Sequence, residues 1–456
     1  MQRRQFLGTL ASAAGMASAQ RARRPNIVFV LVDDLRWDAL GYAGHPFVKT
    51  PHIDRIAREG AIFENAFVTT PLCSPARGSF LTGQYVRTHG VRGNGDNAER
   101  SHKMVTFPRL LHDAGYATAY VGKWHMGTDD SPRPGFDRWV GFRGQGQYED
   151  PPLNIDGKQV AGKGYITDLL SDYAVEFIRK QSAAKPFCVY LSHKAIHGPF
   201  TPAARHASLF SEVAIRRSAN AQDNLAGKPM LTRELPQAAV MKAAKKKGAV
   251  VGPGDELVRN QLRCLTSIDE GLGRVLQALE ETKTLENTLI IFTSDNGYFW
   301  GEHGLGDKRA AYEESIRIPM AARHPALIKP GTRIGGMVLN IDIAPTFLAA
   351  AGLPVHQQMQ GRSMLPLFSG NSKGWREHFL CEYFMEQNFA RVASWEAVRT
   401  TRYKYIHYLD LKGMDELYDL QADSGEMKNL IGEASAKPAL ASMQKLLDTY
   451  RKQVPA

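Results

Sequence analysis

Cysteine is scarce in this chain, and what the sequence lacks narrows its class before any motif is considered. The 456 residues include 4 cysteines, so widely scattered that a fold held together by a framework of disulfides is excluded. No apolar run approaches the roughly 20 residues that a membrane-spanning helix needs, and no internal repeat is present. The length suits one large domain with an appendage, or two domains. We therefore expect a globular protein with a sizeable core and no membrane span.

The N-terminus is typical of an export signal. Arg3 and Arg4 precede a mild apolar run that ends in Ala-Ser-Ala at residues 17–19, a small-residue cleavage pattern. The arginine pair resembles a twin-arginine signal, although Gln2 and Gly8 depart from the usual pattern. A membrane anchor is the alternative, and the run is too short for one. We predict a signal peptide that ends at residue 19 and a mature protein that is periplasmic or secreted.

Basic residues outnumber acidic ones, which gives a formal net charge of +11. Long-range attraction draws a basic surface to sulfated or otherwise acidic polymers, and equally to nucleic acid, so composition leaves the partner open. A region with a lysine-rich stretch, at about residues 203–255, is predicted to be a surface insertion. Its lysines are either a solvated face or a contact for a polyanionic chain.

Oxygen-bearing side chains follow two strand-like runs at the points where the runs end. One apolar, β-branched run ends at Asp33 and Asp34, and a second leads to Asp295 and Asn296. Such runs predict buried parallel strands, and open α/β sheets bind ligands at the carboxyl ends of these strands. The acids could equally end the strand and cap the next segment of the chain. As a set, three carboxylates and an amide suit Ca²⁺, or less well Mg²⁺, and do not suit zinc.

A short stretch around Cys73 combines a thiol, a guanidinium and a predicted helix start. Ser74 suits an N-cap and Pro75 the first helical position, which would place Cys73 just ahead of a helix. The amides of that helix start, with Arg77 one turn on, would favour an anion, either a Cys73 thiolate or a bound oxyanion. Free cysteine is also commonly a small, inert core residue, so the stretch by itself leaves these interpretations open.

Three further segments place cations or imidazoles after predicted elements. Lys123 and His125 follow a predicted strand and lie on the same side of the chain if the backbone stays extended. His193 and His197 follow another strand, and an imidazole that titrates near neutral pH suits acid–base chemistry. Two histidines in a loop are nevertheless often incidental. Lys308 stands in a glycine-containing segment further along the chain.

Two of these segments resemble the signatures of a known family. The pattern Cys-x-Pro-x-Arg-Gly at residues 73–78 is similar to the signature of the type I sulfatases, and Gly-Lys-Trp-His-x-Gly at residues 122–127 is similar to their second signature. The resemblance implies an alkaline phosphatase-like α/β fold, with a large, mixed, mostly parallel sheet sandwiched by helices. It covers the chain from residue 25 almost to residue 370, apart from the insertion.

The pattern of apolar residues in the sequence changes after residue 370. Short β-type runs with turns between them, followed by an amphipathic helix, predict a smaller antiparallel sheet plus helix. We therefore predict a catalytic domain over residues 20–370 and a C-terminal subdomain over residues 371–456.

The resemblance also implies roles for individual residues. Cys73 would be converted by a formylglycine-generating or sulfatase-maturating enzyme to 3-oxoalanine (formylglycine), whose hydrate supplies a nucleophilic hydroxyl. His197, with Lys308, would protonate the departing alcohol, and His125 would deprotonate the second hydroxyl so that sulfate is expelled. His193 is left out of the set. The implied metal ligands are Asp33, Asp34, Cys73, Asp295 and Asn296, and the implied catalytic residues are Cys73, Arg77, Lys123, His125, His197 and Lys308.

The substrate is less sharply indicated. Segments within residues 122–157 resemble the N-acetylglucosamine-6-sulfatase branch, which implies removal of a 6-O-sulfate from N-acetylglucosamine in a glycan. A sulfatase for another glycan or an aryl sulfate, or a phosphonate or phosphate monoester hydrolase, is an alternative, because substrate loops change readily on one scaffold. A non-enzymatic alternative is an exported protein that only binds sulfated polymers, and the complete catalytic set argues against it. We expect a sulfated carbohydrate as the partner, and no nucleic acid.

Overall fold

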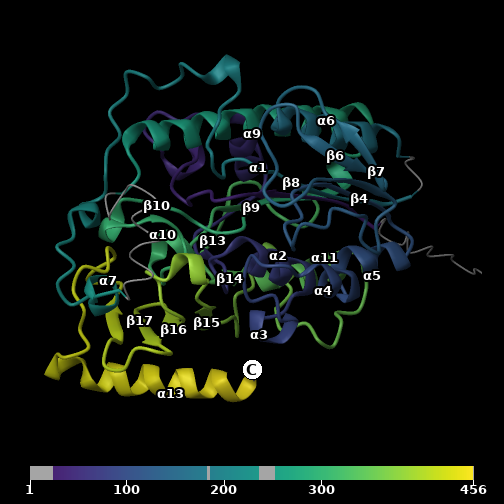
Figure 1. Ribbon diagram of the computed structural model, residues 1–456. Helices are drawn as coiled ribbons and strands as arrows, with labels where there is room; N and C mark the ends of the chain where they lie inside the picture. Colours follow the sequence, from purple (N-terminus) through teal and green to yellow (C-terminus); the bar gives the residue numbers. More distant parts are fainter. Residues whose placement is uncertain (1–23, 182–184, 236–251, 455–456) are drawn as a thin grey trace, which may run out of the picture.

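A ten-stranded sheet forms the centre of the computed structural model, which describes residues 24–181, 185–235 and 252–454 (Figure 1). Its strands are β1 (Asn26–Val32), β2 (Ala61–Phe63), β4 (Ala117–Gly122), β5 (Arg138–Gly141), β6 (Pro152–Ile155), β7 (Lys158–Ala161), β8 (Phe187–Ser192), β9 (Thr288–Ser294), β12 (Met320–Arg323) and β13 (Thr332–Ile334). They are ordered β13-β2-β12-β9-β1-β8-β4-β5-β6-β7. The central strands from β9 to β5 run parallel to one another, and antiparallel pairs occur toward both edges.

The central strand β1 shows why helices cover both faces of this sheet. All of its side chains are buried, with Val28, Val30 and Val32 in the core on one face and the residues between them in the core on the other. The first face is covered by α1 (Pro51–Glu59), α6 (Ile166–Arg179) and α9 (Asp255–Glu281), and the second by α2 (Cys73–Thr82), α5 (Phe107–Asp113) and α11 (Ile343–Ala350) (Figure 1). The predicted mostly parallel sheet between helices is confirmed.

Parallel pairing brings the carboxyl ends of four neighbouring strands to one edge of the sheet. Val32 of β1 lies opposite Ser294 of β9, and Leu31 lies opposite Ser192 of β8. Gly122 of β4 lies opposite the same Ser192. The loops that follow these strands therefore begin side by side, at the edge where open α/β sheets bind ligands.

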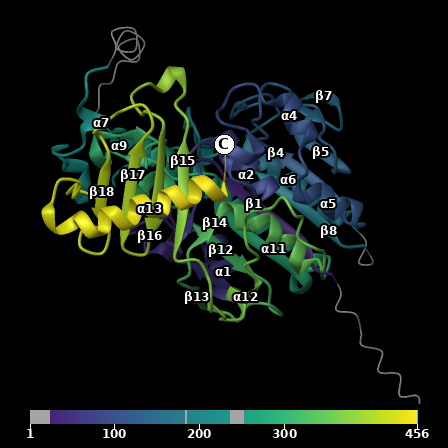
Figure 2. The same ribbon diagram turned by 90° about the horizontal axis from the view of Figure 1, so that it is seen from below.

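A smaller antiparallel sheet follows in the chain. It consists of β15 (His378–Tyr383), β16 (Trp395–Thr400), β17 (Tyr403–Tyr408) and β18 (Glu416–Asp419), and the helix α13 (Lys437–Gln453) lies across it (Figure 2). Trp395 and Tyr418 of this sheet share a hydrophobic cluster with Phe67 and Leu72, which lie just before α2. The smaller antiparallel sheet and the terminal helix are therefore confirmed, and their core is continuous with the segment that leads into α2.

The start of α2 differs from the prediction. The helix begins at Cys73 itself, and its N-cap is Leu72, whose backbone is extended and whose side chain makes no capping hydrogen bond. Ser74 is therefore not the N-cap. Its hydroxyl instead donates to the backbone oxygen of His125, because the loop after β4 packs against the helix start.

The described part of the predicted insertion is tied to the rest of the molecule. Lys228 is fully buried, and its ammonium donates to the backbone oxygen of Glu426 at 2.7 Å. The lysine-rich stretch at residues 241–247 and the predicted signal peptide lie outside the described residues. Cys188 and Cys264 are buried in the hydrophobic core. Across the described ranges, no helix is both long enough and apolar enough to cross a membrane.

Candidate active site

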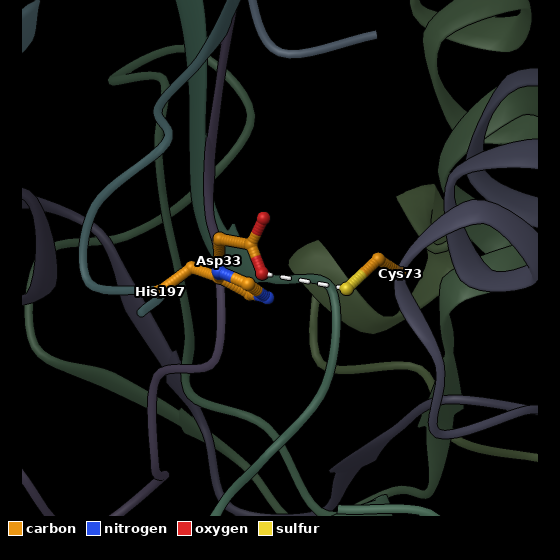
Figure 3. Close-up of side chains that lie close together, drawn as sticks. All are labelled: Asp33, Cys73 and His197. Atoms are coloured by element: carbon orange, nitrogen blue, oxygen red, sulfur yellow. Dashed lines mark hydrogen bonds between the residues drawn. The ribbon is translucent and has the colours of Figure 1, made fainter. Parts of the chain in front are cut away.

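The ten residues singled out in the sequence converge where the loops after β1, β4, β8 and β9 meet the start of α2. Figure 3 shows Asp33, Cys73 and His197 at the centre of this arrangement. One ligand atom from each of the three lies within 4.8 Å of the others, and the Cys73 thiol donates to Asp33 Oδ1 at 3.5 Å. The strand-end loops thus place a carboxylate, a thiol and an imidazole around one point.

Three buried carboxylates form the base of the site. Oxygens of Asp33, Asp34 and Asp295 lie within 4.8 Å of one another. Burial, and next the Asp33 charge, raises the pKa of Asp295 to about 6, and burial also raises the pKa of Asp34 although Lys308 opposes it. Burial would raise the pKa of Asp33 as well, but Lys123 and neighbouring cations hold that pKa well below its usual range. Carboxylates crowded in this way would be stabilised by additional positive charge.

Asn296 completes a donor set that fits a hard cation. Its amide nitrogen donates to Asp34 at 2.6 Å, while its Oδ1 is buried without a hydrogen-bond partner in the described part of the chain. A buried polar atom left without a partner costs about 1 to 3 kcal/mol, so a partner from outside the protein is expected here. Three carboxylates and this oxygen form an all-oxygen set of the kind that Ca²⁺ or Mg²⁺ binds. The residues therefore fit the predicted divalent cation.

Arg77 holds this base in place. Its Nε donates to Asp295 at 3.0 Å, its Nη2 to Asp33 at 3.0 Å, and its Nη1 to both the Lys123 backbone oxygen and Ser192 Oγ at 2.6 Å. Nη2 also lies 2.9 Å from Asp295 Oδ2. Together these contacts occupy the donors of the guanidinium, so Arg77 orients the two carboxylates around residue 73.

Two lysines bring positive charge close to residue 73. The Lys123 ammonium donates to Asp33, and the Lys308 ammonium donates to Asp34 and lies 3.2 Å from the Cys73 sulfur. Both side chains are buried. Burial would lower the pKa of Lys308, but the Asp34 charge outweighs it and raises that pKa well above its usual range. Lys308 is therefore a fixed cation at neutral pH.

The Cys73 thiol itself is not activated. Burial, and next the Asp33 charge, raises its pKa to about 12, so the sulfur stays protonated at neutral pH. Of the interpretations that the sequence left open, the structure disfavours a Cys73 thiolate. The lysines and the helix start then remain available for a bound oxyanion.

The two histidines lie on the open side of the site. His125 has a positive φ of 55°, and its Nε2 is 2.9 Å from the Gln145 amide nitrogen. His197 Nε2 lies 3.9 Å from Asp34 Oδ2, and its Nδ1 lies 3.0 Å from the Gly198 backbone oxygen. Burial, and next the Lys123 charge, lowers the pKa of both imidazoles well below the usual value. Both are therefore neutral at neutral pH, and can accept or pass on a proton once substrate charge enters.

A cavity of about 660 Å³ opens from these residues to the surface. Asp34, His125, His197 and Lys308 line its floor, and its rim includes Gly93, Asn94, Gln145, Phe200, Tyr298, Arg309, Glu386 and Asn388. A larger cavity of about 810 Å³ lies between residues 36–47 and 212–218, and its lining includes none of the predicted site residues. Size alone would therefore have pointed to the wrong cavity.

Several residues of the site were missed by sequence reasoning. Asn94 Oδ1 accepts a hydrogen bond from the Ser74 amide at 3.0 Å, and Glu386 Oε1 accepts one from the Asn94 amide at 3.1 Å. Glu386 comes from the loop after β15, so the smaller sheet contributes to the rim. Gln145 lies in the glycine-rich part of residues 122–157, a region that the sequence linked to the substrate and not to the catalytic set, whereas Asn94 and Glu386 carry no local signal. His193, by contrast, is fully buried with neither ring nitrogen bonded in the described chain.

Comparison with known proteins gives consistent matches over almost the whole chain. The family model Sulfatase matches residues 25–353, and the model N-sulphoglucosamine sulphohydrolase, C-terminal, matches residues 301–453. The N-acetylglucosamine-6-O-sulfatase of Bacteroides thetaiotaomicron is 33% identical, with 97% of this chain and 89% of that protein covered. A protein solved in complex with its substrate D-glucosamine-2-N,6-O-disulfate is 32% identical, with a TM-score of 0.84 over 95% of this chain and 98% of that one.

The fold is also shared more widely. A phosphonate monoester hydrolase from Silicibacter pomeroyi has a TM-score of 0.76 with this chain, at 22% identity over 94% of this chain and 96% of that one. At this level of identity the likeness concerns the fold, and the chemistry has to be argued from the site.

Proposed function

We propose that this chain, which belongs to the sulfatase family, removes 6-O-sulfate from N-acetylglucosamine or a related glucosamine residue of a sulfated glycan. The chain is a sulfuric ester hydrolase by family, and the substrate is the proposed part. The relatives' names support it, since one is an N-acetylglucosamine-6-O-sulfatase and another was solved with a 6-O-sulfated glucosamine. The observation that carries the chemistry is the pair Lys123 and Lys308 held beside residue 73, because a sulfate ester resists attack until its charge is neutralised.

The nucleophile is proposed to be residue 73 after oxidation of its side chain to formylglycine by a maturation enzyme. A thiol whose pKa is raised to about 12 is a poor nucleophile at neutral pH, which supports a changed side chain. Asp33, Asp34, Asp295, Asn296 and residue 73 would hold a divalent cation, for which we propose Ca²⁺ because its contacts tolerate irregular geometry. When bound, this cation would act as a Lewis acid toward a sulfate oxygen and would lower the pKa of the residue 73 hydroxyl.

The remaining steps, sulfate binding and proton transfer, are assigned to two lysines and two histidines of the chain. Lys123 and Lys308 bind the sulfate oxygens and balance their charge. One hydroxyl of hydrated residue 73 forms a bond to sulfur as the bond between sulfur and the sugar oxygen breaks. His197, which takes up a proton when the anionic sulfate ester binds beside it, gives this proton from Nε2 to the sugar oxygen, so that the sugar leaves as an alcohol. His125 takes a proton from the second hydroxyl of residue 73, which becomes the aldehyde oxygen as the bond between the residue 73 carbon and the sulfate oxygen breaks, so that sulfate leaves and the aldehyde is restored.

We further propose that the protein acts in the periplasm or outside the cell. The arginine pair and small-residue cleavage pattern at the N-terminus support this location. Replacing Arg3 and Arg4 with lysine should block export by the twin-arginine route. Undiminished export of that variant would overturn the twin-arginine route.

The substrate proposal is tested with a panel of esters. We expect kcat/KM for 6-sulfated N-acetylglucosamine to exceed that for 4-sulfated N-acetylgalactosamine and for an aryl sulfate. Mass spectrometry of the peptide that contains residue 73 should show loss of the thiol in favour of an aldehyde. An intact thiol in active protein would overturn the nucleophile, and preferred hydrolysis of a phosphonate monoester would overturn the substrate class.

A further inference from the structure

The loop that carries His197 is held by side chains that the proposed mechanism does not use. Tyr148 Oη donates to the backbone oxygen of His197 at 2.6 Å, and Lys194 Nζ donates to the backbone oxygen of Gly198 at 2.9 Å. Further along, Tyr165 Oη donates to the backbone oxygen of Thr201 at 3.0 Å. The first two contacts therefore fix the two peptide groups that follow His197 in the chain.

Lys194 is the least expected member of this arrangement. It is 1% exposed, and within the described ranges its ammonium pairs with no carboxylate. Its contacts are the Gly198 oxygen and the face of the Tyr148 ring, whose centroid lies 4.7 Å away. Burial, and next the Lys123 charge, lowers the pKa of Lys194 to about 8. A buried cation without a counter-ion is costly, and an apolar side chain of similar size would fill this place at least as stably.

Gly198 links Lys194 to the imidazole. The same backbone oxygen that accepts a hydrogen bond from Lys194 lies 3.0 Å from His197 Nδ1. Because a carbonyl oxygen can only accept, Nδ1 carries a hydrogen and donates to it. His197 Nε2 is then the nitrogen that faces the site, 3.9 Å from Asp34 Oδ2. Movement of the Gly198 carbonyl would turn the ring and shift Nε2. Lys194 itself does not line the cavity, so it reaches the reaction only through His197.

We propose that Tyr148 and Lys194 are positioning residues that hold His197 Nε2 toward the oxygen of the departing alcohol. The inference rests on the proposed function, in which His197 protonates that oxygen. It assigns to this pair the orientation of the ring and not the binding of substrate.

Two substrates with different leaving groups distinguish a misoriented acid from a general loss of enzyme activity. A sugar alcohol leaves poorly unless it is protonated, whereas a nitrophenol leaves as a stable anion and needs little help. Tyr148→Phe and Lys194→Met should each lower kcat for the 6-sulfated sugar roughly 10- to 100-fold, because small displacements of a catalytic group have effects of this size. The same variants should lower kcat for 4-nitrophenyl sulfate at least about tenfold less, with KM for the sugar little changed.

Tyr165→Phe is the matched control. It removes a phenol-to-carbonyl hydrogen bond of the same kind from the same loop, but at Thr201 and not beside His197. We expect it to reduce both activities by the same small factor. Thermal unfolding of each variant shows whether the protein is folded, and Tyr148→Phe still tests the proposal if Lys194→Met does not fold.

His197→Ala distinguishes failure of this inference from failure of the proposed function. If it harms the sugar sulfate selectively while Tyr148→Phe harms both esters equally, the positioning role is wrong and the acid role stands. If His197→Ala harms both esters equally, His197 is not the leaving-group acid, and the positioning role falls with it.

Discussion

Two buried clusters of charged side chains in this molecule contain the same residue types but have different roles. One is the active site at the strand ends, with Asp34, Asp295 and Lys308 among its members. The other, which we call the inter-sheet cluster, consists of Glu313 in α10 (Glu313–Ile316), Arg399 and Lys404 in the smaller sheet, and Glu426 in the segment after β18. Lys308 and Lys404 are both buried lysines paired with acids, yet the first faces a cavity and the second does not.

The inter-sheet cluster is a closed set of ion pairs. Glu313 lies 2.9 Å from the Lys404 ammonium and 3.1 Å from the Arg399 guanidinium, and Lys404 lies 2.7 Å from Glu426. Burial would raise the pKa of Glu313, but Lys404 and Arg399 outweigh it and hold that pKa well below its usual value. Each acid has a cation, so the cluster joins α10 and the segment after β18 to the smaller sheet and needs no further charge.

The active site is arranged in the opposite way. Its carboxylates crowd one another, which together with burial raises the pKa of Asp295 to about 6, and Asn296 Oδ1 has no partner in the described chain. Such an arrangement costs stability in the empty protein and is offset when a cation and an anionic substrate bind. Charge content alone therefore does not mark a functional site, whereas incomplete pairing of buried charges beside a cavity does.

The largest expected effect is a loss of enzyme activity when Lys308 of the active site is replaced. Lys308→Met should lower kcat/KM for the sulfated sugar by about 10³-fold, because it removes a fixed cation from the sulfate site. With Ca²⁺ present, its unfolding temperature should stay close to wild type, since the cation compensates Asp34. Steady-state kinetics and a thermal melt measure both, and an activity loss below tenfold would contradict the role.

Replacing Lys404, the matched lysine of the inter-sheet cluster, should lower the free energy of unfolding. Lys404→Met leaves Glu313 and Glu426 buried with one cation fewer, and breaking a buried pair in this way costs about 3 to 5 kcal/mol. Urea unfolding measures this loss, while kcat per folded molecule should remain near wild type. A normally stable but inactive Lys404→Met would show that the two clusters are not independent.

Metal removal should affect one cluster alone. After chelation, added Ca²⁺ should stabilise wild type by about 2.7 kcal/mol at a concentration of 100 Kd. Asp295→Asn should lose most of this gain because a neutral amide replaces a negatively charged ligand, whereas Glu313→Gln should keep it. Calorimetry with and without Ca²⁺ measures the difference, and equal gains in both variants would place the cation elsewhere.

The smallest expected effect concerns the free energy of unfolding of the metal-free protein, to which two acids contribute with opposite pH dependence. The pKa of Glu313 is lower in the folded than in the unfolded state, so its stabilising contribution is present above the unfolded value of 4.5 and is lost as pH falls. The pKa of Asp295 is raised from 3.8 to about 6, so stability is lost as pH rises between these values.

Urea midpoints across pH 3 to 7 check these slopes. Glu313→Gln should make the decline on the acid side shallower, and Asp295→Asn should make the decline toward neutral pH shallower, each by on the order of 1 kcal/mol. Since each variant is compared with itself across pH, the loss of an ion pair in the variant does not affect the slope. Identical slopes in wild type and both variants would contradict the assigned causes.

Much of the fold was predictable because its central strands are buried on both faces. An uninterrupted apolar run such as that of β1 has one plausible place, inside a parallel sheet, and the acids after it then fall at the ligand-binding edge. The start of α2 was predicted less well. Ser74 has the chemistry of an N-cap, but its hydroxyl is bonded to the loop of His125, a partner about fifty positions away that no local pattern reveals.

The reactive groups, and the strand ends that carry them, could be identified from the sequence because side-chain chemistry and apolar periodicity are local properties. Which of these groups are paired and which are left unpaired depends on how the chain packs. This packing buried the Cys73 thiol and raised its pKa, closed the inter-sheet cluster, and placed Lys194 and Tyr148 behind His197. Pairing and burial depend on distances between segments far apart in the chain, and these are set only when the sheets and helices pack.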